Sequence, residues 1–139
     1  MMRDLASNIA VRLVIAPAAN TDLGTTPLVG TVIDRLGFNS LVYAIITGTL
    51  SDANATYAVL LEESDEDDAN FSAVADEHLT GTEAAAGFTY ANDGVARKLG
   101  YRGTKRYTRL TITPTGADSG NSPIAAVAIL GHPADAPVA

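Results

Sequence analysis

The chain has 139 residues, of which 47% are apolar and 18% are charged, and its formal net charge at pH 7 is −7. This composition excludes a disordered chain, and a soluble chain of this length fits one domain that buries roughly 70% of its unfolded surface. The sequence contains no cysteine, which excludes disulfides, thiolate metal sites and a cysteine nucleophile. The negative charge disfavours general binding to phosphates, so we expect no nucleic-acid partner.

Neither a membrane span nor a secretion signal is predicted. The longest apolar runs, Leu41–Ile46 and Ala125–Leu130, are far shorter than the ~20 residues that cross a bilayer. Residues 1–8 contain no apolar run of signal-peptide length, and we expect them to form a short flexible arm.

The first half of the chain has the patterns of β-strands. Apolar residues alternate over Ile9–Ile15, and Leu28–Ile33 offers a second, short strand. In Phe38–Leu50 the residues of both parities are apolar, which predicts a central strand covered on both faces. Thr56–Ser64 follows after a short turn, so we expect these two strands to form a hairpin.

An acidic run ends the strand that begins at Thr56. It places six carboxylates within seven positions: Glu62, Glu63, Asp65, Glu66, Asp67 and Asp68. Clustered carboxylates are calcium ligands, but the run lacks the spacing and the turn glycine of an EF-hand loop. We therefore predict a solvated loop and no metal or other cofactor. Asp76–Gly87 has room for one helical turn without an amphipathic period.

The second half contains the chain's most unusual segment. Arg97–Thr113 combines a strand–turn–strand pattern with six of the nine basic residues, and it is predicted to be a cationic β-hairpin. Ile124–Leu130 follows as another strand that is apolar on both faces, and residues 132–139 form a proline-containing tail.

Eight or nine short strands without a helix of normal length predict an all-β fold. We expect a single-domain antiparallel β-sandwich over residues 1–139, with the arm at 1–8 and the tail at 132–139. Periodicity leaves jelly-roll and Ig-like topologies equally open.

Three interpretations of the basic segment compete, and a protein interface is favoured. If Leu110 and Ile112 face the core, Tyr107 and Arg109 share the outer face, and tyrosine and arginine are enriched at interfaces. Alternatively, the charges only protect a strand edge, or they bind single-stranded nucleic acid or sugar. The predicted interface residues are Arg97, Lys98, Arg102, Lys105, Arg106, Tyr107, Arg109, Glu62, Glu63 and Asp65.

Opposite charges in one chain also suggest self-association. A basic surface on one subunit can meet the acidic run of its neighbour, and such a heterologous contact closes into a ring. The sequence therefore predicts a salt-linked homo-oligomer as a hypothesis.

No catalytic constellation is present. The two histidines, His78 and His132, are not spaced as metal ligands, and the sequence contains no GxSxG, Walker-type or GxGxxG motif. We therefore predict that the protein is not an enzyme.

Several strings together resemble a known family. They are GFNSLVYAIITGTL at Gly37–Leu50, YAVLLEES at Tyr57–Ser64, KLGYRGTKRYTRLTIT at Lys98–Thr113 and AVAILGHP at Ala126–Pro133. These strings resemble small proteins encoded among the head genes of tailed bacteriophages and prophages, and the similarity extends over most of the chain.

The resemblance implies a virion component without enzymatic activity, and specifically a capsid decoration (cement) protein. Such a protein is assembled in the host cytoplasm, binds the lattice of the major capsid protein at the capsid surface, and commonly forms trimers. The arm and the tail are then expected to grip the lattice.

Two alternatives stay open at this stage. One is a recognition module that presents Tyr101, Arg102 and Tyr107 to a host-surface glycan. The other is a different virion position, in the tail or at the head–tail joint.

Overall fold

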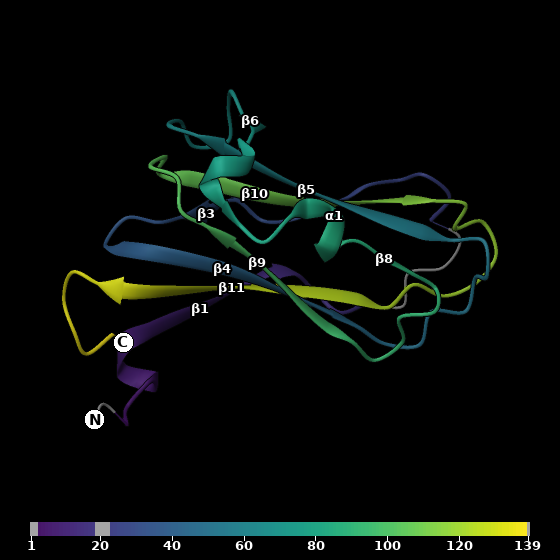
Figure 1. The fold of residues 1–139 in the computed structure, drawn as a ribbon, viewed down its shortest axis with the longest axis horizontal. Coiled ribbons are helices and arrows are strands. Elements are labelled where there is room, and N and C mark those ends of the chain that lie inside the picture. The colour runs from purple at the N-terminus through teal and green to yellow at the C-terminus, as the bar shows by residue number, and fades with distance from the viewer. Residues whose placement is uncertain (1–2, 19–22, 139) are drawn as a thin grey trace.

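The protein is a sandwich of two antiparallel β-sheets that lie one above the other (Figure 1). The structure is a computed structural model that describes residues 3–18 and 23–138. Its strands and helix are β1 (Ile9–Ile15), β2 (Leu28–Val29), β3 (Ile33–Asp34), β4 (Phe38–Thr47), β5 (Thr56–Ser64), β6 (Ser72–Ala73), β7 (Leu79–Thr80), α1 (Glu83–Ala86), β8 (Phe88–Thr89), β9 (Ala96–Tyr101), β10 (Tyr107–Thr115) and β11 (Ile124–Pro133). Two 3₁₀ turns complete the described elements: an N-terminal turn at Ala6–Asn8 and a second at Asp76–His78.

The strand order identifies the topology. Sheet I has the order β1-β11-β4-β9-β7, and sheet II has the order β2-β10-β5-β6, with β3 paired to β10 and β8 paired to β5. The long strands alternate between the sheets along the chain: β4 lies in sheet I, β5 in sheet II, β9 in sheet I, β10 in sheet II and β11 in sheet I. This arrangement is a jelly roll, so the all-β sandwich is confirmed and the Ig-like alternative is excluded.

Both predicted hairpins are wrong. β4 and β5 lie in different sheets, and so do β9 and β10, which form the two halves of the basic segment Arg97–Thr113. The reason is the burial of apolar rows. Leu99 of β9 and Leu110 of β10 are both completely buried, because they point into the interior from opposite sheets. If β9 and β10 formed a hairpin, both apolar rows would lie in the same sheet, and the opposite sheet would lack one of the rows that it packs against.

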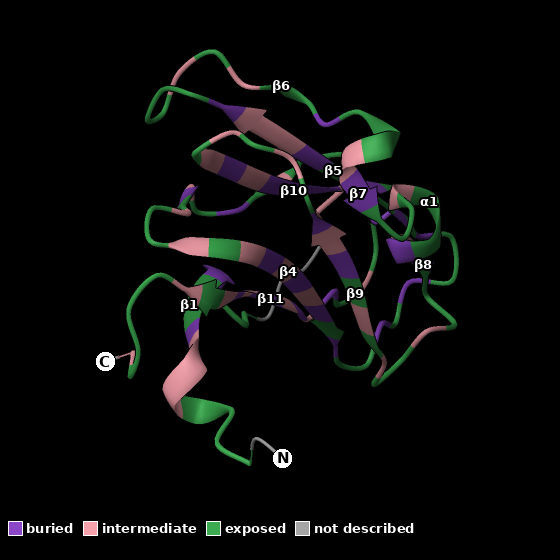
Figure 2. Ribbon diagram, turned by 60° about the vertical axis from the view of Figure 1, so that its left-hand side comes forward, coloured by how far each residue is buried: buried purple, intermediate pink, exposed green. Residues whose placement is uncertain are grey.

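The core lies between the sheets and follows the alternation of each strand. The interior residues of β4 are Leu41, Tyr43 and Ile45, and Figure 2 shows buried residues alternating with less buried ones along this strand. Burial of one such side chain contributes roughly 1.5–3 kcal/mol. The one polar atom of Tyr43, its hydroxyl, is 2.5 Å from the Oγ1 of the buried Thr108 across the sandwich, which satisfies both groups.

The short elements near the edges agree with the local sequence. Where the sequence predicts one helical turn within Asp76–Gly87, the structure has two, a 3₁₀ turn at Asp76–His78 and the α-helical turn Glu83–Ala86. The Thr82 hydroxyl caps the second turn by accepting a hydrogen bond from the Ala85 N–H at 3.0 Å. β5 ends at Ser64, in the acidic run, where the Ser64 hydroxyl donates to the Ala69 carbonyl at 2.5 Å.

The two terminal segments lie beside one another at one end of sheet I (Figure 1). The Val138 N–H donates a hydrogen bond to the Ser7 carbonyl at 2.8 Å. β11 continues to Pro133, so the predicted tail begins inside a strand. Residues 1, 2 and 139 of the predicted arm and tail lie outside the described residues, and the flexibility of both segments stays a prediction.

Candidate interaction surfaces

The side of sheet I that faces away from the sandwich is apolar and open. In β4, Val42, Ala44 and Ile46 alternate with the interior residues, and the side chain of Ile46 is 47% exposed. The predicted coverage of this strand on both faces is therefore wrong. In a two-layer fold the second sheet covers only one face of the first.

Neighbouring strands extend this surface in register. On β1, Val11 pairs with Ile129 and Leu13 pairs with Val127 of β11, and Val11 and Leu13 are each 56% exposed. We call the resulting surface the outer face. Its residues are Ile9, Val11 and Leu13 of β1; Ala125, Val127 and Ile129 of β11; Val42, Ala44 and Ile46 of β4; and Ala96, Lys98 and Gly100 of β9.

Lys98 is the one charged residue of the outer face. The exposed parts of the other side chains present on the order of 500 Å² of apolar surface, which is within the roughly 300–600 Å² of the largest patch on a typical monomer, and such patches are often functional.

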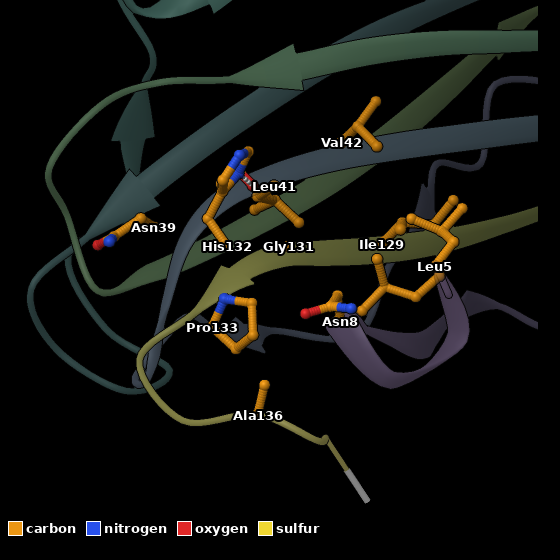
Figure 3. Close-up of a pocket in the computed structure, with 12 residues that line it drawn as sticks. Leu5, Asn8, Asn39, Leu41, Val42, Ile129, Gly131, His132, Pro133 and Ala136 are labelled. Carbon is orange, nitrogen blue, oxygen red and sulfur yellow. Dashed lines mark hydrogen bonds between the residues drawn. The ribbon is translucent and has the colours of Figure 1, made fainter. Parts of the chain in front are cut away.

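A pocket of about 630 Å³ opens at one end of the outer face (Figure 3). Its apolar walls come from Leu5, Val42, Ile129, Pro133 and Ala136, so the N-terminal turn, two central strands and the C-terminal segment all contribute. The pocket lets a side chain of a partner insert beside a flat sheet, as ligand pockets of this size and composition do.

His132 lies at the edge of this pocket. Its backbone has a φ of 49°, in the left-handed region that is uncommon for residues other than glycine. The ring Nδ1 is 2.8 Å from the Ser40 hydroxyl, which orients the imidazole (Figure 3). The other histidine, His78, is half-buried, with its Nε2 3.9 Å from a Glu77 carboxylate oxygen.

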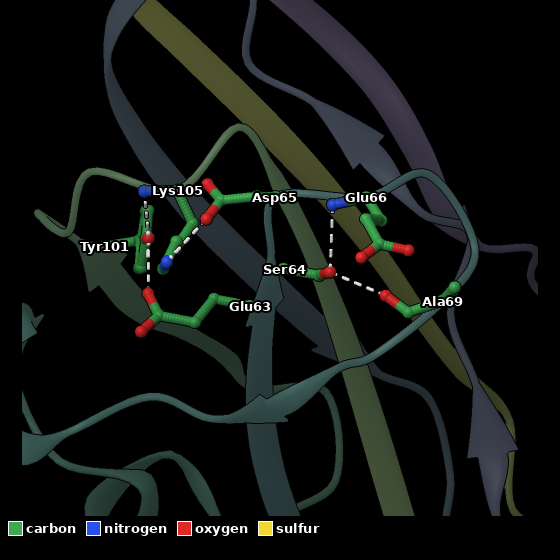
Figure 4. Close-up of polar contacts among 7 residues, drawn as sticks. All are labelled: Glu63, Ser64, Asp65, Glu66, Ala69, Tyr101 and Lys105. Atoms are coloured by element: carbon green, nitrogen blue, oxygen red, sulfur yellow. Dashed lines mark hydrogen bonds and ion pairs between the residues drawn. The ribbon is translucent and has the colours of Figure 1, made fainter.

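The predicted interface residues of opposite charge meet at one end of the sandwich (Figure 4). The Tyr101 hydroxyl donates to a Glu63 carboxylate oxygen at 2.5 Å and accepts from the Lys105 N–H at 3.1 Å. The Lys105 ammonium is 2.6 Å from an Asp65 carboxylate oxygen. Burial, followed by the bond to Glu63, raises the pKa of Tyr101, and the hydrogen bond with Asp65 raises the pKa of Lys105.

Two arginines of β10 and the loop before it are also paired. The Arg109 guanidinium donates to Glu62, its cross-strand neighbour, at 3.0 Å, and lies 4.3 Å from the centre of the Phe71 ring. Arg106 donates two hydrogen bonds of 2.8 Å to the Asp34 carboxylate. This bond from Arg106 lowers the pKa of Asp34.

We call this cluster the charged end. It consists of Asp34, Glu62, Glu63, Asp65, Tyr101, Lys105, Arg106 and Arg109. The acidic and basic residues that we predict to meet across subunits meet here within one chain. Their use as a protein interface stays a prediction.

The other predicted interface residues lie elsewhere or have backbone partners. Arg97 donates to the Ala85 carbonyl and Arg102 donates to the Glu77 carbonyl, each at 3.0 Å. Lys98 projects from the outer face, as described above. Leu110 and Ile112 face the core, as we predict for a strand that turns Tyr107 and Arg109 outward.

Tyr101 cannot belong to the predicted glycan platform, whereas Arg102 is exposed and Tyr107 is partly exposed, so a glycan contact at these two residues stays a prediction. Tyr101 is only 3% exposed, and its hydroxyl is already engaged by Glu63 and Lys105. A buried ring cannot stack on a sugar.

The acidic run holds no evident cation site in the structure. Within residues 3–18 and 23–138, no three His, Asp or Glu side chains are grouped so that they could hold a metal ion. In the same part of the chain, no helix is long and apolar enough to cross a membrane.

The outer face is absent from the sequence-based predictions, although the apolar pattern that indicates it is present in the sequence. Apolar residues fill both parities of β4 and β11, while residues 3–18 and 23–138 form no helix long enough to cover a second side of the sheet. In an all-β sandwich, that combination indicates a strand with an apolar face left open.

Comparison with known proteins supports the fold. No protein-family model matches the sequence, and no curated protein sequence matches it. Among solved structures, the PBSX exported protein XepA matches with 18% identity and a TM-score of 0.56, over 88% of this chain and 37% of XepA. A xylan-binding domain from CBM 22 matches with 10% identity and a TM-score of 0.35, over 95% of this chain and 90% of that domain. The chain thus spans little more than a third of XepA.

Proposed function

We propose that the protein is a non-enzymatic structural component of a tailed-phage or prophage particle, and specifically a capsid decoration protein that binds the lattice of the major capsid protein. The observation that carries this proposal is the outer face. A sheet that exposes about 500 Å² of apolar surface and one charged side chain is suited to be covered by protein.

The rest of the molecule suits the same role. The core between the sheets and the ion pairs of the charged end make a small, rigid domain, which can bind without a large cost of ordering. The net charge of −7 favours solubility before assembly and disfavours contact with the packaged nucleic acid. The family resemblance of the sequence supports a virion location.

The terminal segments are the proposed contacts with the capsid lattice. Residues near both termini lie together, joined by the hydrogen bond from Val138 to Ser7, and they border the pocket of Leu5 and Pro133. One lattice contact at this end would therefore reach the arm, the tail and the pocket together.

Immunogold labelling of purified particles tests the proposal. We expect gold over the whole capsid surface, and we expect purified protein to co-sediment with capsids assembled without it. Label confined to one vertex or to the tail would favour a head–tail joining or tail component and would contradict decoration. Unlabelled particles would contradict a virion role altogether.

A further inference from the structure

We propose that the outer face binds the outer face of a second copy of this chain, so that two copies form a two-fold pair. This inference rests on the proposed function in assigning the outer face to assembly. It names a second copy as the partner of this face, while the terminal segments keep the proposed contact with the capsid lattice. Three properties of the surface support a second copy: its area, its shape and its charge.

The area is sufficient for a specific pair. Val11, Leu13 and Ile46 each expose about half of their side chain, at 56%, 56% and 47%. Two outer faces packed together would bury on the order of 1,000 Å² in total, which is the level at which specific interfaces begin.

The shape of the outer face is complementary to itself. On β1, Val11 and Leu13 are large and exposed, whereas on β9 Gly100 has no side chain and is bordered by Thr80 of β7. A two-fold axis parallel to the strands, between β11 and β4, places β1 of one copy over β9 of the other. Val11 of each copy then lies over Gly100 of its partner, because both residues lie in the row of Ile129 and Val42.

The charge distribution favours this surface over the others. Each copy carries a net charge of −7, so two copies repel wherever their carboxylates approach. None of the outer-face residues is acidic. In the proposed pair, Lys98 lies opposite Leu13, where its aliphatic stem can cover the leucine while the ammonium stays in water.

Pairing through the free edge of β1 is disfavoured. Arg12 is exposed on this edge strand, and a charged side chain there opposes addition of another strand. The Val14 carbonyl already accepts a hydrogen bond from the Thr31 N–H at 2.9 Å, so part of the edge is occupied.

The mass of the purified protein in solution tests the pair, with Val11→Glu as the disrupting change. We expect twice the chain mass of 14.3 kDa for the unchanged protein by sedimentation velocity. Val11→Glu places a carboxylate in the contact of each copy, and we expect the dissociation constant to rise at least about tenfold. The matched control is Val29→Glu, because Val29 also lies in a strand and is 59% exposed, but on sheet II. This variant is expected to keep the dimer.

A second variant keeps the test independent of folding defects. The chain has no cysteine, so Val42→Cys introduces a single thiol next to the proposed axis. A short bismaleimide should join two copies of this variant, whereas Leu36→Cys, which is 69% exposed outside the outer face, should remain uncrosslinked.

The outcomes separate this inference from the proposed function. A monomer at all concentrations, a trimer, or equal dissociation by Val11→Glu and Val29→Glu would overturn the two-fold pair. If the monomeric protein still labels whole capsids, the decoration role stands without the pair. A dimer that dissociates with Val11→Glu but never labels particles would support the pair and contradict decoration.

Discussion

The burial of the outer face and of the charged end is the reverse of what their residue types suggest. The outer face consists of residues typical of a core, yet Val11 and Leu13 are more than half exposed. The charged end consists of residues typical of a surface, yet Tyr101 is buried there and Glu63 and Lys105 bond to it. The difference teaches that the charge of a segment does not by itself show whether its side chains are free to bind a partner.

The physical basis is the way in which each surface can be satisfied. A carboxylate and a guanidinium can bond to each other within one chain, as Glu62 and Arg109 do at 3.0 Å, although the buried Arg109 Nε has no hydrogen-bond partner among the described residues. An apolar sheet face can be removed from water only by another layer, and the described chain supplies that layer on one side of sheet I. The outer face is therefore the surface that we propose a second molecule to cover, whereas most groups of the charged end already have partners within the chain.

The largest expected effect compares the contribution to stability of a core leucine with that of a leucine on the outer face. Leu110→Ala in the interior of sheet II should lower the free energy of unfolding by about 2–5 kcal/mol, because Leu110 is fully buried. Leu13→Ala on the outer face should cost well under about 1 kcal/mol at a concentration where the protein is monomeric. Urea denaturation of both variants gives the comparison. Equal losses would mean that the outer face is covered within the monomer.

The next effect tests whether the charged end is internal structure. Tyr101→Phe removes the donor to Glu63 and the acceptor of the Lys105 N–H, so we expect a loss of about 1–2 kcal/mol in the free energy of unfolding. Tyr90→Phe is the control, because Tyr90 is 44% exposed and its change should cost less than about 0.5 kcal/mol. If both variants unfold at the same urea concentration, the Tyr101 cluster contributes nothing to the fold.

A smaller effect separates the pairing of Arg109 with Glu62 from the packing of Arg109 on Phe71. A double-mutant cycle with Arg109→Ala and Glu62→Ala should give a coupling of about 1 kcal/mol, because both side chains are mostly buried. A cycle of Arg109→Ala with Phe71→Leu measures the ring contact in the same way. Zero coupling in both cycles would free Arg109 for a partner and would favour the charged end as an interface.

The fold was largely predictable from sequence, because local alternation determines strands. The strands Ile9–Ile15 and Thr56–Ser64 begin and end as predicted. The helical turn at Glu83–Ala86 lies within the segment where one is predicted. The pairing of strands was not predictable in the same way. Residues that are neighbours in the sequence suggested hairpins at Phe38–Ser64 and Arg97–Thr113, whereas the burial of facing rows places these strands in opposite sheets.

The candidate site was predicted only in part, for a related reason. Charge patterning correctly marked Glu62, Asp65, Lys105 and Arg109 as an unusual group, but sequence separation concealed that they are partners. The outer face is not predictable from one strand alone. A strand that is apolar at both parities has the same sequence pattern whether its second face is covered or exposed. Only the count of available layers distinguishes the two cases.

The smallest expected effect concerns the ion pair of Arg106 with Asp34 at the rim of the charged end. The pKa of the Asp34 carboxyl is lower in the folded protein than in the unfolded chain, so the pair stabilises the fold above about pH 4 and is lost as the pH falls further. Both side chains are nearly half exposed, at 43% and 45%, so solvent screens the interaction. We expect Asp34→Asn to lower the urea midpoint slightly at pH 7, and we expect the difference from the unchanged protein to shrink steadily as the pH falls below about 4. High salt should reduce the difference at pH 7, because it screens exposed charges. A difference that does not shrink as the pH falls would mean that Asp34 acts through the turn it forms with the Leu36 N–H, rather than through Arg106.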